Sequence, residues 1–237
     1  FAAAVILAFL FLAYNLAHTV PSRLDEGSFM VKGYYYWTGK YAPFEEYGPW
    51  TNNMPLAYYI PGFAQYIFNP GLQTGRYFAI FLSFLNFLAL FLLVKRLTNK
   101  WWALLAVTPF AVNPALLMVY VQTISEGVAA CLLSWSFFFL IGKERTTWQI
   151  AAGAFLSALT VLTRQNMIFI VPFVLIYVFW LHGRKQGLIA TAFMSTPLIV
   201  VHVIFYPNIF NLWLTWLPGF LKDLFNFGSF SVGGVQR

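Results

Sequence analysis

Residues 77–94 read YFAIFLSFLNFLALFLLV and contain no charged side chain. A helix that crosses a bilayer needs about 20 mostly apolar residues, with a range of about 17–25. This stretch therefore predicts a transmembrane helix, and it decides the fold class. Because six further charge-free stretches have the same character, we predict seven transmembrane helices, at 1–19, 77–95, 101–120, 123–141, 147–163, 166–181 and 187–206.

The composition of the whole chain agrees with this interpretation. Of the 237 residues, 60% are apolar and 9% are charged, whereas a soluble domain has about 45–50% apolar and 25% charged residues. The chain lacks the polar surface of a soluble enzyme, a disordered tail or a secreted disulfide scaffold. The lone cysteine, Cys131, cannot form an internal disulfide. We predict an all-α integral membrane protein.

Two segments are expected to depart from straight transmembrane helices. Asn113-Pro114 is expected to kink the third helix. The charge-free stretch 47–75 contains four prolines and four glycines, which break the helix that lipid-exposed backbone needs. We therefore expect interfacial helices within an outer loop at 20–76. The aromatic run Tyr34–Trp37 fits an interfacial belt better than a sugar-stacking platform.

The chain begins at Phe1, already inside an apolar run, and its last residues, Gly233–Arg237, close no element. We interpret it as a fragment of a longer protein. The membrane module is expected to cover residues 1–210, and residues 211–237 are expected to be part of an outer loop.

The net charge is +7, from 14 Lys and Arg against 7 Asp and Glu. The basic residues separate apolar segments, so we expect no nucleic-acid partner. One side of the predicted bundle carries seven basic residues in three tight loops, and the other spreads seven over long segments and helix ends. Because short loops determine topology, the first side is predicted to be cytoplasmic. Six of the seven acids then lie on the outer side, which topology does not explain.

Asp25 and Glu26 follow the first helix directly, and they are the first candidate site. Two readings are open. Acids are favourable in the first turn of a following helix, and the residues alone favour this reading. Alternatively, a carboxylate beside apolar walls has a raised pKa and can act as a general base, or it can bind a metal.

Four other residues are candidates for substrate binding: Glu126, Arg164, Arg76 and Glu45. An acid in the hydrocarbon core costs about 2.5–3.5 kcal/mol, so Glu126 is either a functional residue or a cap at a hairpin turn. Arg164 and Arg76 are either interfacial residues whose charged ends extend to water or clamps for a phosphate; for Arg76 the first reading is favoured. No phosphate-binding loop, HExxH motif or Cys/His cluster is present in the sequence.

The order of these parts resembles the GT-C fold membrane glycosyltransferases, and most closely the protein O-mannosyltransferases and the bacterial aminoarabinose-to-lipid-A transferases. The residues that carry the resemblance are Leu24–Gly27 after the first helix, Gly33–Pro43, Asn52–Tyr59, Gly75-Arg76, Glu126 and Leu162–Arg164. One departure is Asn53-Met54-Pro55, where Lys-Pro-Pro is more usual.

The resemblance implies an enzyme that takes a sugar from a polyprenyl-phosphate carrier on the extracytoplasmic face of the cell membrane and inverts the anomeric carbon. Asp25 would then be the base or a metal ligand, and Glu26 would complete the acidic pair. Glu126 matches a second acidic position, and Arg164 matches a basic position near the lipid phosphate. The expected partners are a lipid-linked sugar donor and membrane lipids, and the one cofactor to consider is a divalent metal.

Two other functions are consistent with the sequence. The chain could be a non-catalytic, glycosyltransferase-like subunit of a larger membrane complex, with other membrane subunits as partners. A transporter is disfavoured, because transporters place ionisable residues near the middle of the membrane, and here they gather at its outer surface. The sugar, the acceptor and the carrier length are not specified by the sequence.

Overall fold

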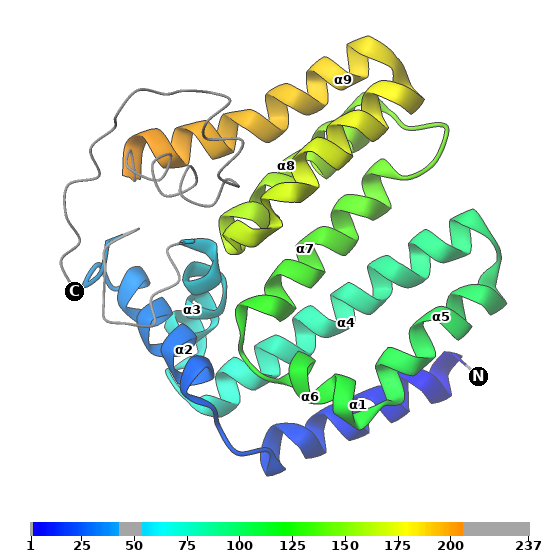
Figure 1. Cartoon of the computed structure of the whole chain (residues 1–237). Coiled ribbons are helices and arrows are strands. Elements are labelled where there is room, and N and C mark those ends of the chain that lie inside the picture. Colours follow the sequence, from blue (N-terminus) through cyan, green and yellow to red (C-terminus); the bar gives the residue numbers. More distant parts are fainter. Residues whose placement is uncertain (1, 43–53, 206–237) are drawn as a thin grey trace, which may run out of the picture. The chain divides into compact units, whose positions relative to one another are not determined.

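The structure of the protein is a computed structural model that describes residues 2–42 and 54–205. Every regular element in these residues is helical (Figure 1). The elements are α1 (Ala2–Thr19), α2 (Leu24–Trp37), α3 (Leu56–Phe68), α4 (Leu72–Leu97), α5 (Lys100–Val112), α6 (Pro114–Val121), α7 (Ser125–Leu140), α8 (Thr147–Thr163), the 3₁₀ helix η1 (Gln165–Phe169) and α9 (Ile170–Phe205). The predicted all-α class is confirmed.

Three helical runs in the described residues are long and apolar enough to cross a membrane: α1, α4 and Gln165–Ile204. The bent pair of α5 and α6 adds a fourth if it crosses as one span. Helices α7 and α8 are apolar but have only 16 and 17 residues. The chain is thus a multi-pass membrane protein with three to four span candidates, and the predicted count of seven is not confirmed.

The backbone of α9 is interrupted at Gly183, where φ is 81° and ψ is 176°. A positive φ is readily adopted by glycine alone among common residues. Two helices therefore meet at this residue, between the predicted spans 166–181 and 187–206.

The predicted kink at Asn113-Pro114 is confirmed, because α5 and α6 are bent by 75°. Asn113 has an extended backbone, and its side-chain oxygen accepts hydrogen bonds from the backbone N–H groups of Ala115 and Leu116. Pro114 stands at the first position of α6, where its missing N–H costs nothing. The two residues thus end one helix and begin the next.

Helix α7 packs between α4 and α8 (Figure 1). Buried hydroxyl groups connect α7 to α8: Ser136 Oγ donates to the Gly153 carbonyl (2.8 Å) and lies 2.6 Å from Ser157 Oγ. Small residues allow the backbones to approach; a Cβ on Gly153 would lie 2.5 Å from the Leu140 side chain. Small and hydroxyl-bearing residues are typical of helix contacts in membranes.

Helices α2 and α3 form within the segment 20–76, where interfacial helices are predicted. Their backbones touch at two glycines: a Cβ on Gly33 would lie 2.4 Å from the Tyr58 carbonyl oxygen, and one on Gly62 would lie 2.2 Å from the carbonyl carbon of Gly33. Trp37 Nε1 donates to the Tyr59 carbonyl at 2.7 Å. This close pairing fixes α2, the helix that carries Asp25 and Glu26.

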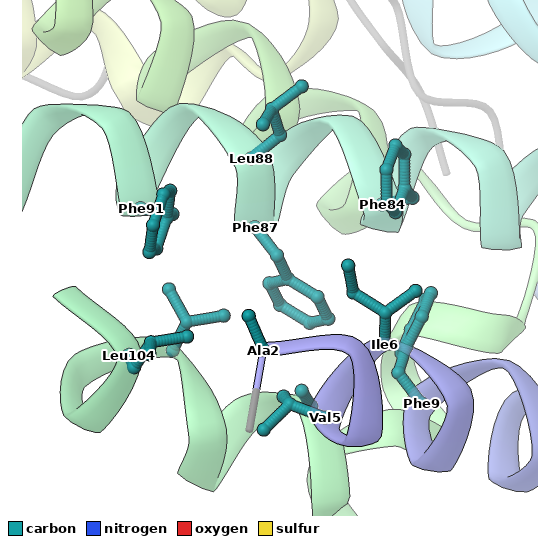
Figure 2. A pocket seen from close by; sticks show the side chains of 11 residues that line it. Ala2, Val5, Ile6, Phe9, Phe84, Phe87, Leu88, Phe91 and Leu104 are labelled. Atoms are coloured by element: carbon teal, nitrogen blue, oxygen red, sulfur yellow. The ribbon is translucent and has the colours of Figure 1, made fainter. Parts of the chain in front are cut away.

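A cavity of about 180 Å³ lies between α1, α4 and α5 (Figure 2). Its walls are apolar side chains such as Phe9, Phe87 and Leu104. It offers no polar group for catalysis, so a candidate site must be sought elsewhere.

The chain divides into two compact units, residues 1–198 and 199–237. Of the second unit, the described residues are 199–205, which are the last turns of α9. The predicted boundary at residue 210 lies outside the described residues.

Candidate functional site

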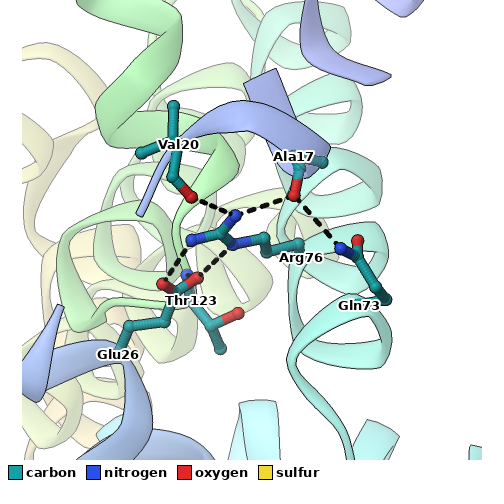
Figure 3. Close-up of polar contacts among 6 residues, drawn as sticks. All are labelled: Ala17, Val20, Glu26, Gln73, Arg76 and Thr123. Atoms are coloured by element: carbon teal, nitrogen blue, oxygen red, sulfur yellow. Dashed lines mark hydrogen bonds and ion pairs between the residues drawn. The ribbon is translucent and has the colours of Figure 1, made fainter. Parts of the chain in front are cut away.

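Two charged side chains form an ion pair in the interior of the first unit. Arg76 Nε and Nη2 donate to the two carboxylate oxygens of Glu26, each at 2.9 Å (Figure 3). Both side chains are fully buried. Glu26 lies in the first turn of α2 and Arg76 in the second turn of α4, because α4 begins at Leu72, before the start predicted at residue 77. The parallel, two-bond geometry is the strongest form of this interaction.

Arg76 also closes the end of α1. Its Nη1 donates to the carbonyl oxygens of Ala17 and Val20, both at 2.7 Å, and Gln73 Nε2 donates to the same Ala17 carbonyl at 3.4 Å. The last carbonyls of a helix have no partner within the helix and favour a cation. All three nitrogens of the Arg76 guanidinium are thus engaged within the protein.

Glu26 accepts a third hydrogen bond, from the backbone N–H of Thr123 at 3.2 Å. Thr123 lies in the turn between α6 and α7. The Glu26–Arg76 pair therefore connects the end of α1, the start of α2, the start of α4 and the α6–α7 turn.

Asp25 precedes Glu26 but has the opposite environment. It is exposed, and its side chain has no hydrogen bond or ion pair with the described residues. The Glu26–Arg76 ion pair fixes the backbone of Asp25, while the Asp25 carboxylate faces solvent. This combination leaves Asp25 available to an external group.

A second ion pair joins Glu126, in the first turn of α7, to Arg164, which follows α8. Arg164 Nη1 contacts both a Glu126 carboxylate oxygen and Ser125 Oγ, the latter at 2.8 Å. The side chains of Arg164 and Glu126 are 25% and 49% exposed. Within the described residues Nη1 is the guanidinium nitrogen that is engaged, so the pair remains open to a ligand.

The α6–α7 turn relates the two ion pairs. Thr123 bonds to Glu26, and three residues later Glu126 bonds to Arg164. Three residues span at most about 11 Å of extended chain. The structure thus brings four predicted residues to the two ends of one short segment: Glu26 and Arg76 at one end, and Glu126 and Arg164 at the other. The fifth, Glu45, lies outside the described residues.

Sequence reasoning did not identify Thr123 or Ser125. The signal for Ser125 was its position next to Glu126. Thr123 gave no signal, because it acts through its backbone N–H, which every residue except proline has.

Burial also lowers the pKa of the Lys32 ammonium on α2 below its ordinary value.

The described residues contain no group of three His, Cys, Asp or Glu side chains that could hold a metal ion. The histidine at the end of α1, His18, instead lies 3.2 Å from the Tyr77 hydroxyl through its Nε2.

A model of the dolichyl-phosphate-mannose-protein mannosyltransferase family matches residues 51–211, which is more than half of the chain. The chain belongs to this family. The resemblance inferred from the sequence is thereby confirmed, and the protein is a membrane glycosyltransferase in general terms. The matched region contains Arg76, Glu126 and Arg164 and begins after Asp25 and Glu26. No curated protein and no solved structure matches the chain.

Proposed function

We propose that the protein transfers a sugar from a polyprenyl-phosphate carrier to an acceptor hydroxyl on the extracytoplasmic face, with inversion of the anomeric carbon. The observation that carries this proposal is the exposed carboxylate of Asp25, which lies next to the buried Glu26–Arg76 ion pair in a chain of the mannosyltransferase family.

In this proposal Asp25 is the general base. Its carboxylate takes the proton from the acceptor hydroxyl as the hydroxyl oxygen bonds to the anomeric carbon. The bond between that carbon and the phosphate oxygen breaks, and the phosphate leaves with the electron pair. Attack opposite the leaving group inverts the carbon.

Glu26 and Arg76 have a positioning role in this mechanism. The Glu26 carboxylate already accepts three hydrogen bonds, and the Arg76 guanidinium has a partner at each nitrogen. Neither has a free group for the substrate in this arrangement. Their contribution is to hold the first turn of α2, and with it Asp25, against α4.

Arg164 is proposed to bind the leaving phosphate, whose negative charge grows in the transition state. A guanidinium suits a phosphate because it presents several donors in one plane. Glu126 holds Arg164 from one side through Nη1, which leaves the remaining N–H groups for phosphate oxygens. Glu45 remains a predicted substrate-binding residue.

Asp25 is the residue that would hold a divalent cation, because Mg²⁺ is often bound by one or two carboxylates together with substrate phosphates. When bound, it would add positive charge beside the leaving group. A transfer assay with and without EDTA measures this dependence.

The direct test replaces Asp25 by asparagine, which keeps the shape and removes the base. Removal of a general base lowers the rate by about 10²–10⁴-fold. The assay measures release of polyprenyl phosphate from a synthetic polyprenyl-phosphate-linked mannose. Glu144→Gln is the matched control, because Glu144 is an exposed acid at the other end of the bundle.

Full transfer activity in the Asp25→Asn variant would refute the catalytic assignment. No turnover in the unmodified protein, together with stoichiometric co-purification of other membrane proteins, would favour the non-catalytic subunit.

A further inference from the structure

A cluster of basic side chains lies at the far end of the bundle from the candidate site. Arg96 stands 20 residues after Arg76 on α4, which places it about 30 Å further along the helix. Arg145 from the α7–α8 loop and His182 from α9 join it there. We name Arg96, Arg145 and His182 the basic cluster.

The basic cluster surrounds the turn that ends α7. Arg96 Nη2 donates to the carbonyl oxygens of Phe138, at 2.8 Å, and Ile141. The Arg145 guanidinium lies against Gly142, since a Cβ on this glycine would come within 2.4 Å of Arg145 Nη2.

Tyr177 brings His182 to the same turn. The backbone N–H of Gly142 donates to the Tyr177 hydroxyl at 3.0 Å, and the centroids of the Tyr177 and His182 rings are 6.0 Å apart. Three basic groups from three segments thus converge on residues 141 and 142.

Each member of the basic cluster has a ring or guanidinium nitrogen without a partner. Arg96 Nε, Arg145 Nε and His182 Nε2 are buried and make no hydrogen bond within the described part of the chain. The described residues hold no ion pair to any of the three. The Nε–H groups of Arg96 and Arg145 are buried donors without an acceptor, which is costly, and a phosphate is the anion whose oxygens match guanidinium donors best. The His182 ring instead forms a hydrogen bond with the backbone of Leu140.

The surroundings of the cluster are those of a membrane surface. Tryptophan gathers at the boundary between lipid and water, and four strongly exposed tryptophans lie on the helix ends at this side: Trp101, Trp102, Trp148 and Trp180. Exposed basic residues accompany them: Lys95, Lys143, Arg184 and Lys185. An anion that reaches this level of a bilayer in quantity is the headgroup of an anionic lipid.

We propose that Arg96 and Arg145, next to His182, bind the phosphate of an anionic phospholipid headgroup at the membrane surface opposite the candidate catalytic site. The site is separate from the proposed donor site, and it would hold the ends of α4 and α7 against α9 near its interruption at Gly183.

The test measures lipid binding to the full chain in detergent micelles by native mass spectrometry, with phosphatidylglycerol and phosphatidylcholine as the two probes. The unmodified chain is expected to prefer phosphatidylglycerol. Arg145→Gln is expected to weaken that preference about fivefold, the usual effect of one basic residue near an anionic surface. The matched control is Lys100→Gln, which removes an exposed charge at the same end but outside the cluster.

Equal binding of the two lipids by the unmodified chain would overturn the proposal. So would an equal loss in Arg145→Gln and Lys100→Gln, because general attraction would then explain the preference. A third arm adds inorganic phosphate, and competition at the concentration of the lipid would assign the site to free phosphate instead. Circular dichroism checks folding, and Arg96→Gln replaces Arg145→Gln in the same comparison if the latter does not fold.

Discussion

At the scale of single residues, the two ion pairs of the candidate site differ mainly in burial. Glu26 and Arg76 are 0% and 1% exposed, whereas about half of the Glu126 side chain is open to its surroundings. Removing one partner of a buried pair leaves an uncompensated charge and costs about 3–5 kcal/mol. An exposed pair contributes about 0–1 kcal/mol. The first pair should therefore determine stability, and the second should determine binding.

Arg76→Met is expected to lower the free energy of unfolding by about 3–5 kcal/mol, because it leaves the Glu26 carboxylate buried and unpaired. The double variant Glu26→Leu with Arg76→Met should lose less, since it buries no charge. Unfolding in mixed micelles, followed by circular dichroism, measures both. A double variant less stable than Arg76→Met would contradict this account of the pair.

Arg164→Gln should leave the free energy of unfolding within about 1 kcal/mol of the unmodified protein. It should lower transfer by about 10–100-fold, the value of one hydrogen bond to a charged group. Titrations with the sugar donor measure the loss of transfer activity. Arg164→Lys keeps the positive charge but lacks the planar set of N–H donors, so it should recover part of that activity. Unchanged transfer in Arg164→Gln would remove this residue from the proposed phosphate site.

At the scale of elements, α2 is positioned by its contact with α3 as well as by the Glu26–Arg76 pair. Gly33→Ala would place a methyl group against the Tyr58 carbonyl, and such overpacking costs about 1–3 kcal/mol. Gly27→Ala is the control on the same helix, because a Cβ there meets nothing within 4 Å; it should be neutral or stabilising by up to about 1 kcal/mol. Equal stability of the two variants would show that the close contact is absent.

The helices of this chain could be predicted because their signal is local. Apolar runs located α1, α4 and α8, and Asn113-Pro114 located the bend between α5 and α6. The predicted start at residue 77 is five residues later than the start of α4 at Leu72, because the charge of Arg76 ends the charge-free stretch. Tertiary contacts extend α4 backward: Gly75 lies against Met30 and Thr123, and Gln65 bonds to Gly71.

The candidate site could be predicted only as a set of residue types. Asp25, Glu126 and Arg164 stand out as charges beside apolar runs, but the partner of Glu26 is 50 residues away at Arg76. Nothing local in the sequence distinguishes a buried, paired arginine from one that reaches the interface. The Glu26 carboxylate accepts three hydrogen bonds, and these distinguish its proposed role from that of Asp25. They depend on packing among four segments of the chain.

At the scale of the whole molecule, the arrangement of the helices across the membrane determines whether the site is extracytoplasmic. If each predicted span crosses, with α5 and α6 as one span and α9 as two, then Ser22 and Asn166 share one side of the membrane. Thr98 and Thr146 lie on the other side, where the short basic loops predict the cytoplasm. Because Cys131 is the lone cysteine, a Cys131→Ala background allows one labelling site at a time.

Single cysteines at the four exposed positions Ser22, Thr98, Thr146 and Asn166 should therefore divide into two pairs. In intact cells, a membrane-impermeant maleimide is expected to label Ser22→Cys and Asn166→Cys. Thr98→Cys and Thr146→Cys should react only after the membrane is permeabilised. Labelling of Asn166→Cys together with Thr98→Cys would mean that an even number of the three segments between them, the α5–α6 pair, α7 and α8, cross the membrane. With α4 crossing, Arg164 would then be separated from Asp25 by the membrane. Labelling of the Thr98 pair alone in intact cells would keep the site together but place it on the cytoplasmic face.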